Sequence, residues 1–502
     1  MEEKEKEKQL PSWNRRGGPK GRVVVRSKWL SLNLPPRRCA TPLLFQEPVQ
    51  VMQWDRIWNR RLLRRGMAKT FREWTPEQST MFPASVLDYV PPGHVVHFVL
   101  NVVREQLDLK TILDKYEEER GYPPFHPVMM VGLLLYSNTQ GIYSSRRIAR
   151  ACQERVDFMA MTGMQKPDFR TISLFRLRHL EELKGLFGQV LKLCRKAGLV
   201  KLGHVALDGT KIRANASKHK SMSYGGMKRR EEELKAEVDR WFEQADRIDR
   251  EEDELYGKDR RGDELPDWVT DKQKRLEKIQ QAKKELEAEA RAEAEAPPDP
   301  SKTAHKAKPT GVPEDKKQKN FTDSESRMMK TSDGFIQGYN GQAAVDAHSQ
   351  VIVAQQLNNN GSDMHQLISM LDQIREQNGR QAKEVSADAG YCSEHNLKEL
   401  SRRRIRGYLA SRWQKDSLAK DGDTKPPAKV GAYVRQMWQR LRQGGHRSRY
   451  RLRKQVVEPV FGHIKHARGF RQFLLRGESK VATEWSLLCT AHNLLKLAAV
   501  AK

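Results

Sequence analysis

The feature that most constrains the fold is a series of short apolar, strand-type runs that a long charged segment interrupts. The runs are HVALDGTKIRANA from His204, FIQGYNGQAAVDA from Phe335, QVIVAQQLN from Gln350, EVSADAGYCSE from Glu384 and RGYLASR from Arg406. Their alternating or β-branched residues are typical of strands, and helical patterns over 362–378 and 396–404 separate the later runs. The order strand, insertion, strand, strand, helix, strand, helix, strand predicts an α/β protein with helices on the faces of its sheet.

Two local signals refine this prediction. A tight turn at residues 347–349 is expected to join the second and third runs, and Ser362 or Asp363 is expected to cap the helix that follows. The interrupting segment, 228–296, is charged and has heptad-spaced apolar residues, with a break over GKDRRGDELP at 257–266. We interpret it as an antiparallel helical hairpin, followed by a linker-like stretch at 297–313. Residues 228–320 are therefore expected to be an insertion within a domain that spans 200–500 and resumes near residue 333.

The region before this domain, 67–199, has apolar residues at spacings of three and four, which predicts an all-α domain. Asp168 is expected to cap a helix that carries Arg170, Arg176 and Arg178. Helices of this kind fit a helix-turn-helix reader of DNA, and they fit a helical bundle with a solvated basic face equally well. We therefore expect a helical N-terminal domain for DNA binding or dimerisation.

The net charge of +28 and the pI near 9.8 favour a polyanionic partner, either nucleic acid or an acidic membrane surface. The charge is concentrated in two patches. Residues 1–66 contain 16 basic and 6 acidic side chains, and residues 401–476 contain 21 and 4. Localised patches favour nucleic acid as the partner.

Residues 1–66 have no sustained hydrophobic period and are expected to be disordered. They are either a DNA-binding extension or an over-long translation start before Met67, and we favour the second.

Other sequence features bear on the compartment. No apolar run approaches the roughly 20 residues that span a bilayer, and the first residues lack the apolar core of a secretory signal. The five cysteines are scattered, which argues against a disulfide framework and a zinc site and suits a reducing cytoplasm. The sequence predicts a cytoplasmic protein without a membrane partner.

Three carboxylates stand out by their surroundings. Asp208 and Asp388 each follow a short apolar run, at an expected strand end, and each precedes small residues. Glu458 is the one acid of an otherwise apolar and basic stretch, VVEPVFGHIKHARGF. On a helix Glu458 shares a face with Gly462 and Lys465, where the glycine leaves clearance and the lysine offers a phosphate contact. Pro459 is best tolerated in a first turn, so the helix is expected to start there.

Three carboxylates brought together repel one another unless cations are bound between them. Hard oxygen ligands favour Mg²⁺ or Mn²⁺, and two ions about 3.5–4 Å apart can promote phosphodiester displacement. The alternative for each aspartate is a turn residue after a strand, and spacing alone does not select these three from 64 acids. The residues by themselves thus leave metal-dependent phosphodiester chemistry as a hypothesis.

At these residues the sequence resembles the DDE transposases of bacterial insertion sequences. The similar blocks are HVALDGTKIRANASKHKSM, GYNGQAAVDA, SADAGYCSE, YRLRKQVVEPVFGHIKHARGFRQFLLRG and the closing AHNLLKL. They occur in the family's order, and the resemblance covers roughly residues 70–500. It implies a ribonuclease H-like mixed sheet with flanking helices, preceded by the all-α domain and interrupted by the charged helical insertion.

The resemblance also implies roles for residues. Asp208, Asp388 and Glu458 would bind two Mg²⁺ (or Mn²⁺) ions; a water would cut the DNA strand, and the freed 3′-OH would attack target DNA. The family places an arginine four residues before the glutamate, whereas this chain has Lys454 there and Arg453 beside it. The residues expected to contact DNA are Lys211, Arg453, Lys454, Lys465, Arg468 and Arg471.

The remaining expectations concern neighbours, partners and alternatives. Asp323 and Asp346 are given structural roles, and Cys392 is expected to pack rather than react. The expected partners are double-stranded DNA, as transposon ends and target, and a second copy of the chain in a homodimer or larger assembly near the bacterial nucleoid. Two alternatives stay open: a DNA-binding protein that has lost catalysis, and a ribonuclease H-like nuclease without strand transfer.

Overall fold

The strand-type runs form one six-stranded sheet in the computed structural model of the protein. The structure describes residues 71–76, 85–116, 123–256, 267–295, 311–331, 334–411, 430–444 and 447–501. The extension predicted over 1–66 and the break predicted over 257–266 lie outside these residues, as does most of the predicted linker.

The sheet is mixed, with the order β4-β5-β1-β7-β8, and β6 also pairs with β5. The strands are β1 (His204–Arg213), β4 (Arg327–Thr331), β5 (Gly334–Asp346), β6 (Ile352–Asn358), β7 (Glu384–Ala387) and β8 (Arg406–Leu409). Strand β5 is antiparallel to β1, β4 and β6, whereas β1, β7 and β8 run parallel. The five predicted strands and the turn at 347–349 are confirmed. Strand β4 was not predicted, because its five residues, RMMKT, lack an alternating apolar pattern.

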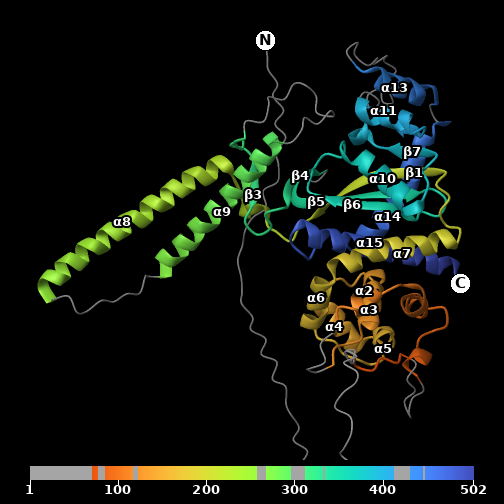
Figure 1. Ribbon diagram of the computed structural model, residues 1–502, viewed down its shortest axis with the longest axis horizontal. Helices are drawn as coiled ribbons and strands as arrows, with labels where there is room; N and C mark the ends of the chain where they lie inside the picture. The colour runs from red at the N-terminus through yellow and green to blue at the C-terminus, as the bar shows by residue number, and fades with distance from the viewer. Residues whose placement is uncertain are drawn as a thin grey trace, which may run out of the picture. The chain divides into compact units, whose positions relative to one another are not determined.

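Helices cover the sheet, as the α/β prediction requires (Figure 1). They are α10 (Gln366–Asn378), α11 (Glu394–Arg402), α13 (Ala432–Gly444), α14 (Leu452–Gly462) and α15 (Glu478–Val500). Helix α10 packs against β5 and β6, α14 against β1 and β5, and α15 against β6. The predicted cap of α10 is wrong: the helix begins after His365, and neither Ser362 nor Asp363 occupies its cap position.

The predicted start of α14 at Pro459 is also wrong. The helix begins seven residues earlier, at Leu452, directly after a 3₁₀ turn over Arg449–Arg451, and Pro459 lies inside it. A proline inside a helix leaves the carbonyl four residues before it without its usual donor. Here that carbonyl belongs to Gln455, and it accepts a hydrogen bond from Gln350 Nε2 at 3.1 Å. This contact from outside the helix helps α14 to continue past the proline.

The N-terminal part is helical, as predicted. Its helices are α1 (Val95–Asn101), α2 (Lys110–Leu113), α3 (Pro127–Thr139), α4 (Ser145–Glu154), α5 (Val156–Thr162), α6 (Phe169–Arg178) and α7 (Leu180–Lys196). Asp168 caps α6 by accepting from Arg170 N at 2.8 Å, as expected. Arg176 on the same helix is buried and donates to Tyr143 O at 3.0 Å, so it is no part of a solvated basic face.

This helical part and the sheet share a hydrophobic core. Helices α7 and α15 lie side by side beneath the sheet in Figure 1. A single cluster of buried residues runs from Val90 to Leu497 and includes both helices and the strands. The boundary proposed at residues 199/200 stays a prediction. Within the described ranges, no helix combines the length and the apolar character needed to cross a membrane.

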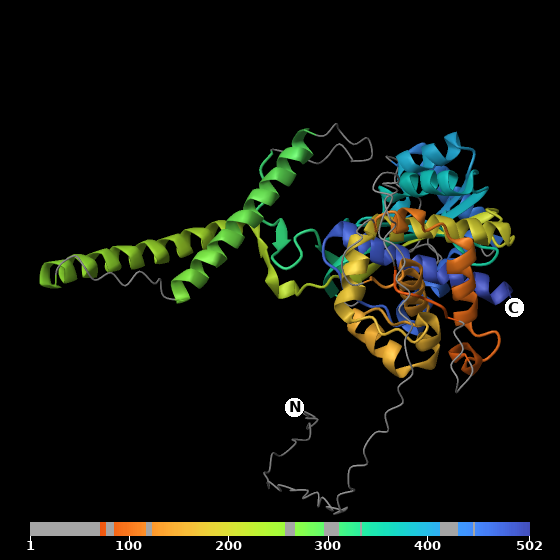
Figure 2. The ribbon, with the colours of Figure 1, turned by 60° about the horizontal axis from the view of Figure 1, so that its bottom comes forward.

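The charged segment forms the predicted hairpin of two long helices, α8 (Tyr224–Tyr256) and α9 (Asp267–Glu295), visible in Figures 1 and 2. Their apolar contact is a separate small cluster of Tyr224, Met227, Leu234, Ile279, Ala282 and Leu286. The ion pairs Glu237–Lys272 and Glu231–Lys283 have registers that run in opposite directions, which makes the helices antiparallel. The short strands β2 (Ser221–Ser223) and β3 (Gln318–Asn320) pair at the base of the hairpin.

Candidate functional site

Two of the three predicted acids meet on neighbouring strands of the sheet. In the parallel pairing of β1 and β7, Ala206 lies opposite Ser386. Continuing this register by two residues brings Asp388, the first residue after β7, beside Asp208. Asp388 follows its strand as predicted, but Asp208 does not end its strand, because β1 continues to Arg213 in pairing with β5. The aspartates therefore meet where β7 stops and β1 continues.

Both aspartates are half-buried and have few hydrogen-bond donors. Asp208 accepts from Gly209 N at 2.9 Å and from Arg453 Nη1 at 2.7 Å. Burial raises the pKa of Asp208 to about 7; the positive charge of Arg453 opposes this rise, and the negative charge of Asp388 adds to it. Burial likewise raises the pKa of Asp388, with a further contribution from the charge of Asp363, against its hydrogen bond from Gly390 N. This end of the sheet therefore carries negative charge that is only partly neutralised.

Helix α14 supplies the third acid and the cation that links it to the pair. Arg453 is half-buried. Its Nη1 lies 2.7 Å from Asp208 Oδ2, and its Nη2 lies 3.7 Å from Glu458 Oε1. The side chain of Glu458 is 52 % exposed. Lys454 is exposed, so of the two neighbouring basic residues it is Arg453 that faces the acids. The phenol of Tyr450, one turn earlier, hydrogen-bonds to Arg453, and burial raises the pKa of Tyr450.

A fourth acid at this place, Asp363, was not among the predicted site residues. Its Oδ1 accepts hydrogen bonds from Asn340 Nδ2 at 2.7 Å and from Gln342 Nε2 at 2.6 Å. Gln342 Oε1 in turn accepts from the hydroxyl of the buried Tyr391. The sequence interpretation took Asp363 for a helix cap. The available signal was the pair of amides in GYNGQ, because buried amide groups require hydrogen-bond partners.

The basic residues predicted to contact DNA occupy different environments. Lys465 is half-buried, and its Nζ donates to Lys211 O at 3.2 Å. Burial lowers the pKa of Lys465, while the charge of Asp208 opposes this change. Lys211 Nζ donates to Lys330 O at 2.8 Å, and the exposed Arg471 lies 3.3 Å from the ring of His466. The space beside Gly462 is open, with no atom within 4 Å of where a side chain would begin.

The structure corrects the expectation for Arg468, which is buried. Its guanidinium donates to Leu488 O at 3.3 and 3.2 Å and to Asn138 O at 3.4 Å. Burial also lowers the pKa of Arg468. A guanidinium that lies inside the protein on backbone carbonyls is not available to a phosphate. We therefore remove Arg468 from the DNA-contact residues.

The two other acids from the matched sequence blocks have structural surroundings. Asp346 accepts from the backbone N–H groups of Lys201, Leu202 and His348. Asp323 accepts from Tyr339 Oη at 2.9 Å and from Gly477 N at 3.3 Å. These hydrogen bonds hold chain segments together, in keeping with the structural roles expected for both acids.

The side chains do not form a finished metal site. Among the described residues, no three His, Cys, Asp or Glu side chains converge on one point suited to a metal ion. At the sheet this follows from Arg453, whose guanidinium lies against Asp208 and near Glu458. Arg453 thus occupies the space between Asp208 and Glu458.

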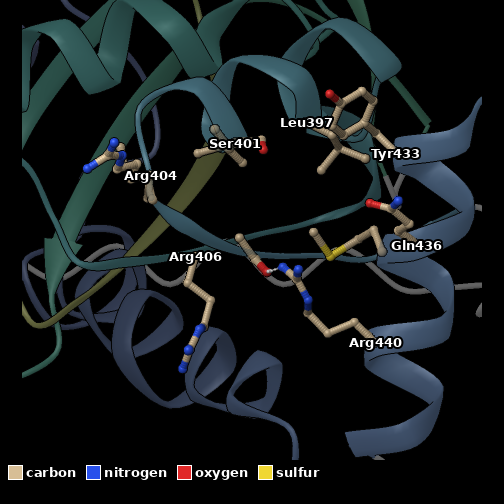
Figure 3. Close-up of a pocket in the computed structure, with 11 residues that line it drawn as sticks. Leu397, Ser401, Arg404, Arg406, Tyr433, Gln436 and Arg440 are labelled. Atoms are coloured by element: carbon tan, nitrogen blue, oxygen red, sulfur yellow. Dashed lines mark hydrogen bonds between the residues drawn. The ribbon is translucent and has the colours of Figure 1, made fainter.

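A separate pocket of about 270 Å³ lies between α11, β8 and α13 and contains none of these acids (Figure 3). Figure 3 shows Arg404, Arg406 and Arg440 at its edge pointing in different directions. Arg440 Nη1 donates to Gly407 O at 3.3 Å. Because its cations do not converge, this pocket has no arrangement that selects a ligand.

Comparison with known protein families gives two matches. Residues 299–494 match the model described as a transposase DDE domain, and residues 84–178 match the one described as a transposase domain (DUF772). The first match contains Asp388 and Glu458, and the second covers most of helices α1 to α6. Comparisons with curated proteins and with solved structures gave no significant match.

Proposed function

Because the chain belongs to the DDE transposases of insertion sequences, we propose that it binds the terminal inverted repeats of its element and catalyses metal-dependent cleavage and transfer of DNA strands. One observation supports the proposal: Asp208 in β1 and Asp388 directly after β7 act on each other electrostatically, and Arg453 pairs with Asp208 and lies near Glu458. Three acids from distant parts of the chain, each in a block that resembles the family, share one place at the sheet.

The catalytic domain is proposed to have a ribonuclease H-like arrangement. The mixed sheet, with β1 between antiparallel β5 and parallel β7, supports this assignment. So does the delivery of Glu458 by α14, a helix that packs on β1 after the last strand. Helices α8 and α9 would then be an insertion between the first and second acids.

Asp208, Asp388 and Glu458 are proposed to hold two Mg²⁺ or Mn²⁺ ions. The donor chemistry fits, because carboxylate oxygens are the ligands that these hard cations prefer. The raised pKa values of Asp208 and Asp388 also fit, since they reflect burial first and neighbouring negative charge second, and a bound cation would favour the charged form of both carboxylates. When bound, such a pair of ions activates a water or 3′-OH and stabilises the leaving oxygen in phosphodiester displacement.

Arg453 is proposed to pair with Asp208 before cations bind and with a DNA phosphate afterwards. In the described structure it neutralises part of the charge on Asp208. A bound cation would take over that role, and the planar guanidinium could then hold a DNA phosphate through two hydrogen bonds. Lys211, Lys454, Lys465 and Arg471 are the further proposed contacts to the DNA backbone.

The proposed partners follow from the reaction. Strand transfer joins transposon ends to target DNA, so double-stranded DNA is the substrate in both steps. Two ends must be held together, which favours at least two copies of the chain in one complex. Excess positive charge over 401–476 supports a polyanionic partner, because lysine and arginine side chains neutralise the DNA phosphates.

The test is cleavage of supercoiled DNA that carries the element's ends, with wild-type protein and Asp388→Asn compared in Mg²⁺. We expect nicked and linear products from the wild type only, and equal DNA binding by both proteins in a gel-shift assay. Equal cleavage by the two proteins would contradict the assignment of Asp388.

The same assay separates the alternatives. A protein that has lost catalysis would bind the ends but cut nothing in Mg²⁺ or Mn²⁺. A nuclease without strand transfer would cut but would never join the cut 3′ end to target DNA. Joined products therefore decide in favour of transposition.

A further inference from the structure

Asp363 lies three residues before α10, in a segment of the chain that contains none of the three predicted acids. Its side chain is half-buried, so solvent reaches it, yet its position is fixed from one side. Asn340 and Gln342, two residues apart on β5, both donate to its Oδ1. Both donors are neutral amides, so neither brings a positive charge beside this carboxyl group, as an arginine or a lysine would.

Gly209 on β1 makes room for this carboxylate. A side-chain carbon at residue 209 would lie 2.5 Å from Asp363 Oδ1 and 2.5 Å from Gln342 Nε2, closer than atoms can approach. Gly209 lies opposite Gln342 in the β1–β5 pairing, so its vacant side-chain position is on the Gln342 face. Asp208, the preceding residue, points to the other face. The carboxylate of Asp363 thus approaches strand β1 from the face of the sheet opposite the Asp208 side chain.

The other oxygen of Asp363 faces Asp388. The point where a side chain of Gly390 would begin lies 3.3 Å from Asp363 Oδ2 and 3.0 Å from Asp388 Oδ1. Strand β7 has ended at Ala387, so on this side of β1 no further strand separates the two faces of the sheet. The two carboxylates therefore border a common space that two glycines keep open.

A buried polar group without a partner lies on the Gly209 side of Asp363. Asn340 is fully buried, and its Oδ1 has no hydrogen-bond donor among the described residues. The same atom lies 3.0 Å from the vacant side-chain position of Gly209. A buried acceptor without a donor indicates a missing partner, such as the hydration shell of an ion.

We propose that Asp363 is a fourth carboxylate of the cation site, which binds a divalent cation together with Asp388 while Asn340 and Gln342 hold it in place. This inference rests on the proposed function, because it assumes that Asp208 and Asp388 bind divalent cations. It extends the family's three-acid set by one residue that the fold of this chain supplies.

The experiment measures Mn²⁺ binding to the full-length protein by electron paramagnetic resonance of free Mn²⁺, without DNA. We expect Asp363→Asn to weaken binding by about tenfold or more, as the loss of a ligand or its supporting group does in other metal sites. Asp372→Asn is the matched control, because Asp372 lies on α10 and pairs with Arg403 away from the site; its affinity should equal that of the wild type. Unchanged affinity in Asp363→Asn would overturn the inference.

A second variant keeps all four charges. Gly390→Ala would put a methyl group between Asp363 and Asp388, and we expect a similar loss of Mn²⁺ affinity. Gly185→Ala is its control, since no atom lies within 4 Å of that position. If Asp363→Asn does not fold, Gly390→Ala and Gly185→Ala provide the test instead. Wild-type Mn²⁺ affinity in Gly390→Ala would contradict the inference.

The two proposals can fail separately. If the wild type binds Mn²⁺ through Asp363 but never cleaves DNA, the inference holds and the proposed function fails. If the wild type cleaves DNA through Asp388 while Asp363→Asn binds Mn²⁺ normally, the proposed function holds and the inference fails.

Discussion

Asp208 in β1 and Glu484 in α15 have the same raised pKa in opposite surroundings. Burial raises the pKa of each to about 7, and a nearby arginine opposes the rise in each case. Glu484 is only 4 % exposed, and its carboxylate accepts from Leu474 N at 3.1 Å and from Leu475 N at 3.2 Å. Asp208 has one backbone donor, one arginine and two further acids nearby.

The comparison shows that a raised pKa does not by itself identify a functional acid. Around Glu484 the fold supplies two donors and the charge of Arg176, and no other acid is among the causes of its pKa shift. These contacts attach the segment before α15 to the helix itself. Around Asp208 the fold gathers half-buried acids of like charge. At Asp208 the acids outnumber the hydrogen-bond donors that would stabilise their charged form. This imbalance distinguishes the candidate site from the surroundings of Glu484.

The largest expected effect is on catalysis at Asp208. Asp208→Asn removes a proposed metal ligand, and the loss of several kcal/mol of transition-state stabilisation corresponds to about a thousandfold or more in cleavage rate. The variant should stay folded, with a free energy of unfolding within about 1 kcal/mol of the wild type, because the amide oxygen can still accept a hydrogen bond and the repulsion by Asp388 is relieved. Single-turnover cleavage and urea unfolding measure the two quantities. If Asp208→Asn cleaved slowly but also lost several kcal/mol of stability, the loss of activity could be due to unfolding. The contrast with Glu484 would then be wrong.

The opposite pattern is expected at Glu484. Glu484→Ala removes the negative charge near the buried Arg176 and leaves the N–H groups of Leu474 and Leu475 without this acceptor, which should lower the free energy of unfolding by about 3 kcal/mol or more. Glu484→Gln keeps an acceptor and should lose less, about 1–2 kcal/mol. The cleavage rate per folded molecule, measured well below the unfolding temperature, should equal that of the wild type. A selective loss of cleavage in Glu484→Gln would place this residue among the functional acids.

A smaller effect is expected at Asp346, a second acid with a complete set of donors. It holds three backbone N–H groups, including that of Leu202, whose backbone has φ 51°. Asp346→Asn retains only one acceptor oxygen and should destabilise the fold by about 1–2 kcal/mol. Thermal and urea unfolding provide the measurement. DNA cleavage below the transition should not change; if it fell a hundredfold, the division between structural and site acids would be wrong.

A further effect concerns pH and cations. A carboxyl group with a raised pKa binds its proton more tightly in the folded state, so stability falls as pH rises from about 4 to about 7. Asp208 and Glu484 should both contribute to this fall in EDTA, by on the order of 1 kcal/mol for each pKa unit. At pH 7.5 added Mg²⁺ should restore only the part of the lost stability that is due to the acids around Asp208.

Unfolding curves at several pH values distinguish the two sources. Asp208→Asn should respond less to Mg²⁺ than the wild type does. Glu484→Gln should respond fully to Mg²⁺ and yet depend less on pH. Equal Mg²⁺ responses in wild type and Asp208→Asn would contradict cation binding at this site.

Much of the fold followed from local patterns. Period-two apolar runs predicted β1, β5, β6, β7 and β8, since each buries side chains against a neighbouring layer. The heptad of the charged segment predicted the hairpin of α8 and α9, because its two helices can bury apolar residues only against each other. The position of Asp388 after β7 was predictable for the same local reason.

The misses depended on contacts between distant segments. Pro459 was expected to begin a helix, but Gln350, more than 100 residues away, satisfies the carbonyl that the proline frees. Arg468 was expected on the surface, but carbonyls of α3 and α15 enclose it. Asp363 fitted a local capping pattern, whereas amides of β5 hold it at the site.

The sequence alone determined the chain's elements, its basic character and, through the resemblance of several blocks, the identity of the three acids. It could do so because periodicity, charge and motif are properties of neighbouring residues. Only the tertiary structure decided which acids share a place, which arginine faces them and which buried charges are satisfied. Those outcomes depend on strand register and on donors from remote segments, and no local pattern encodes them.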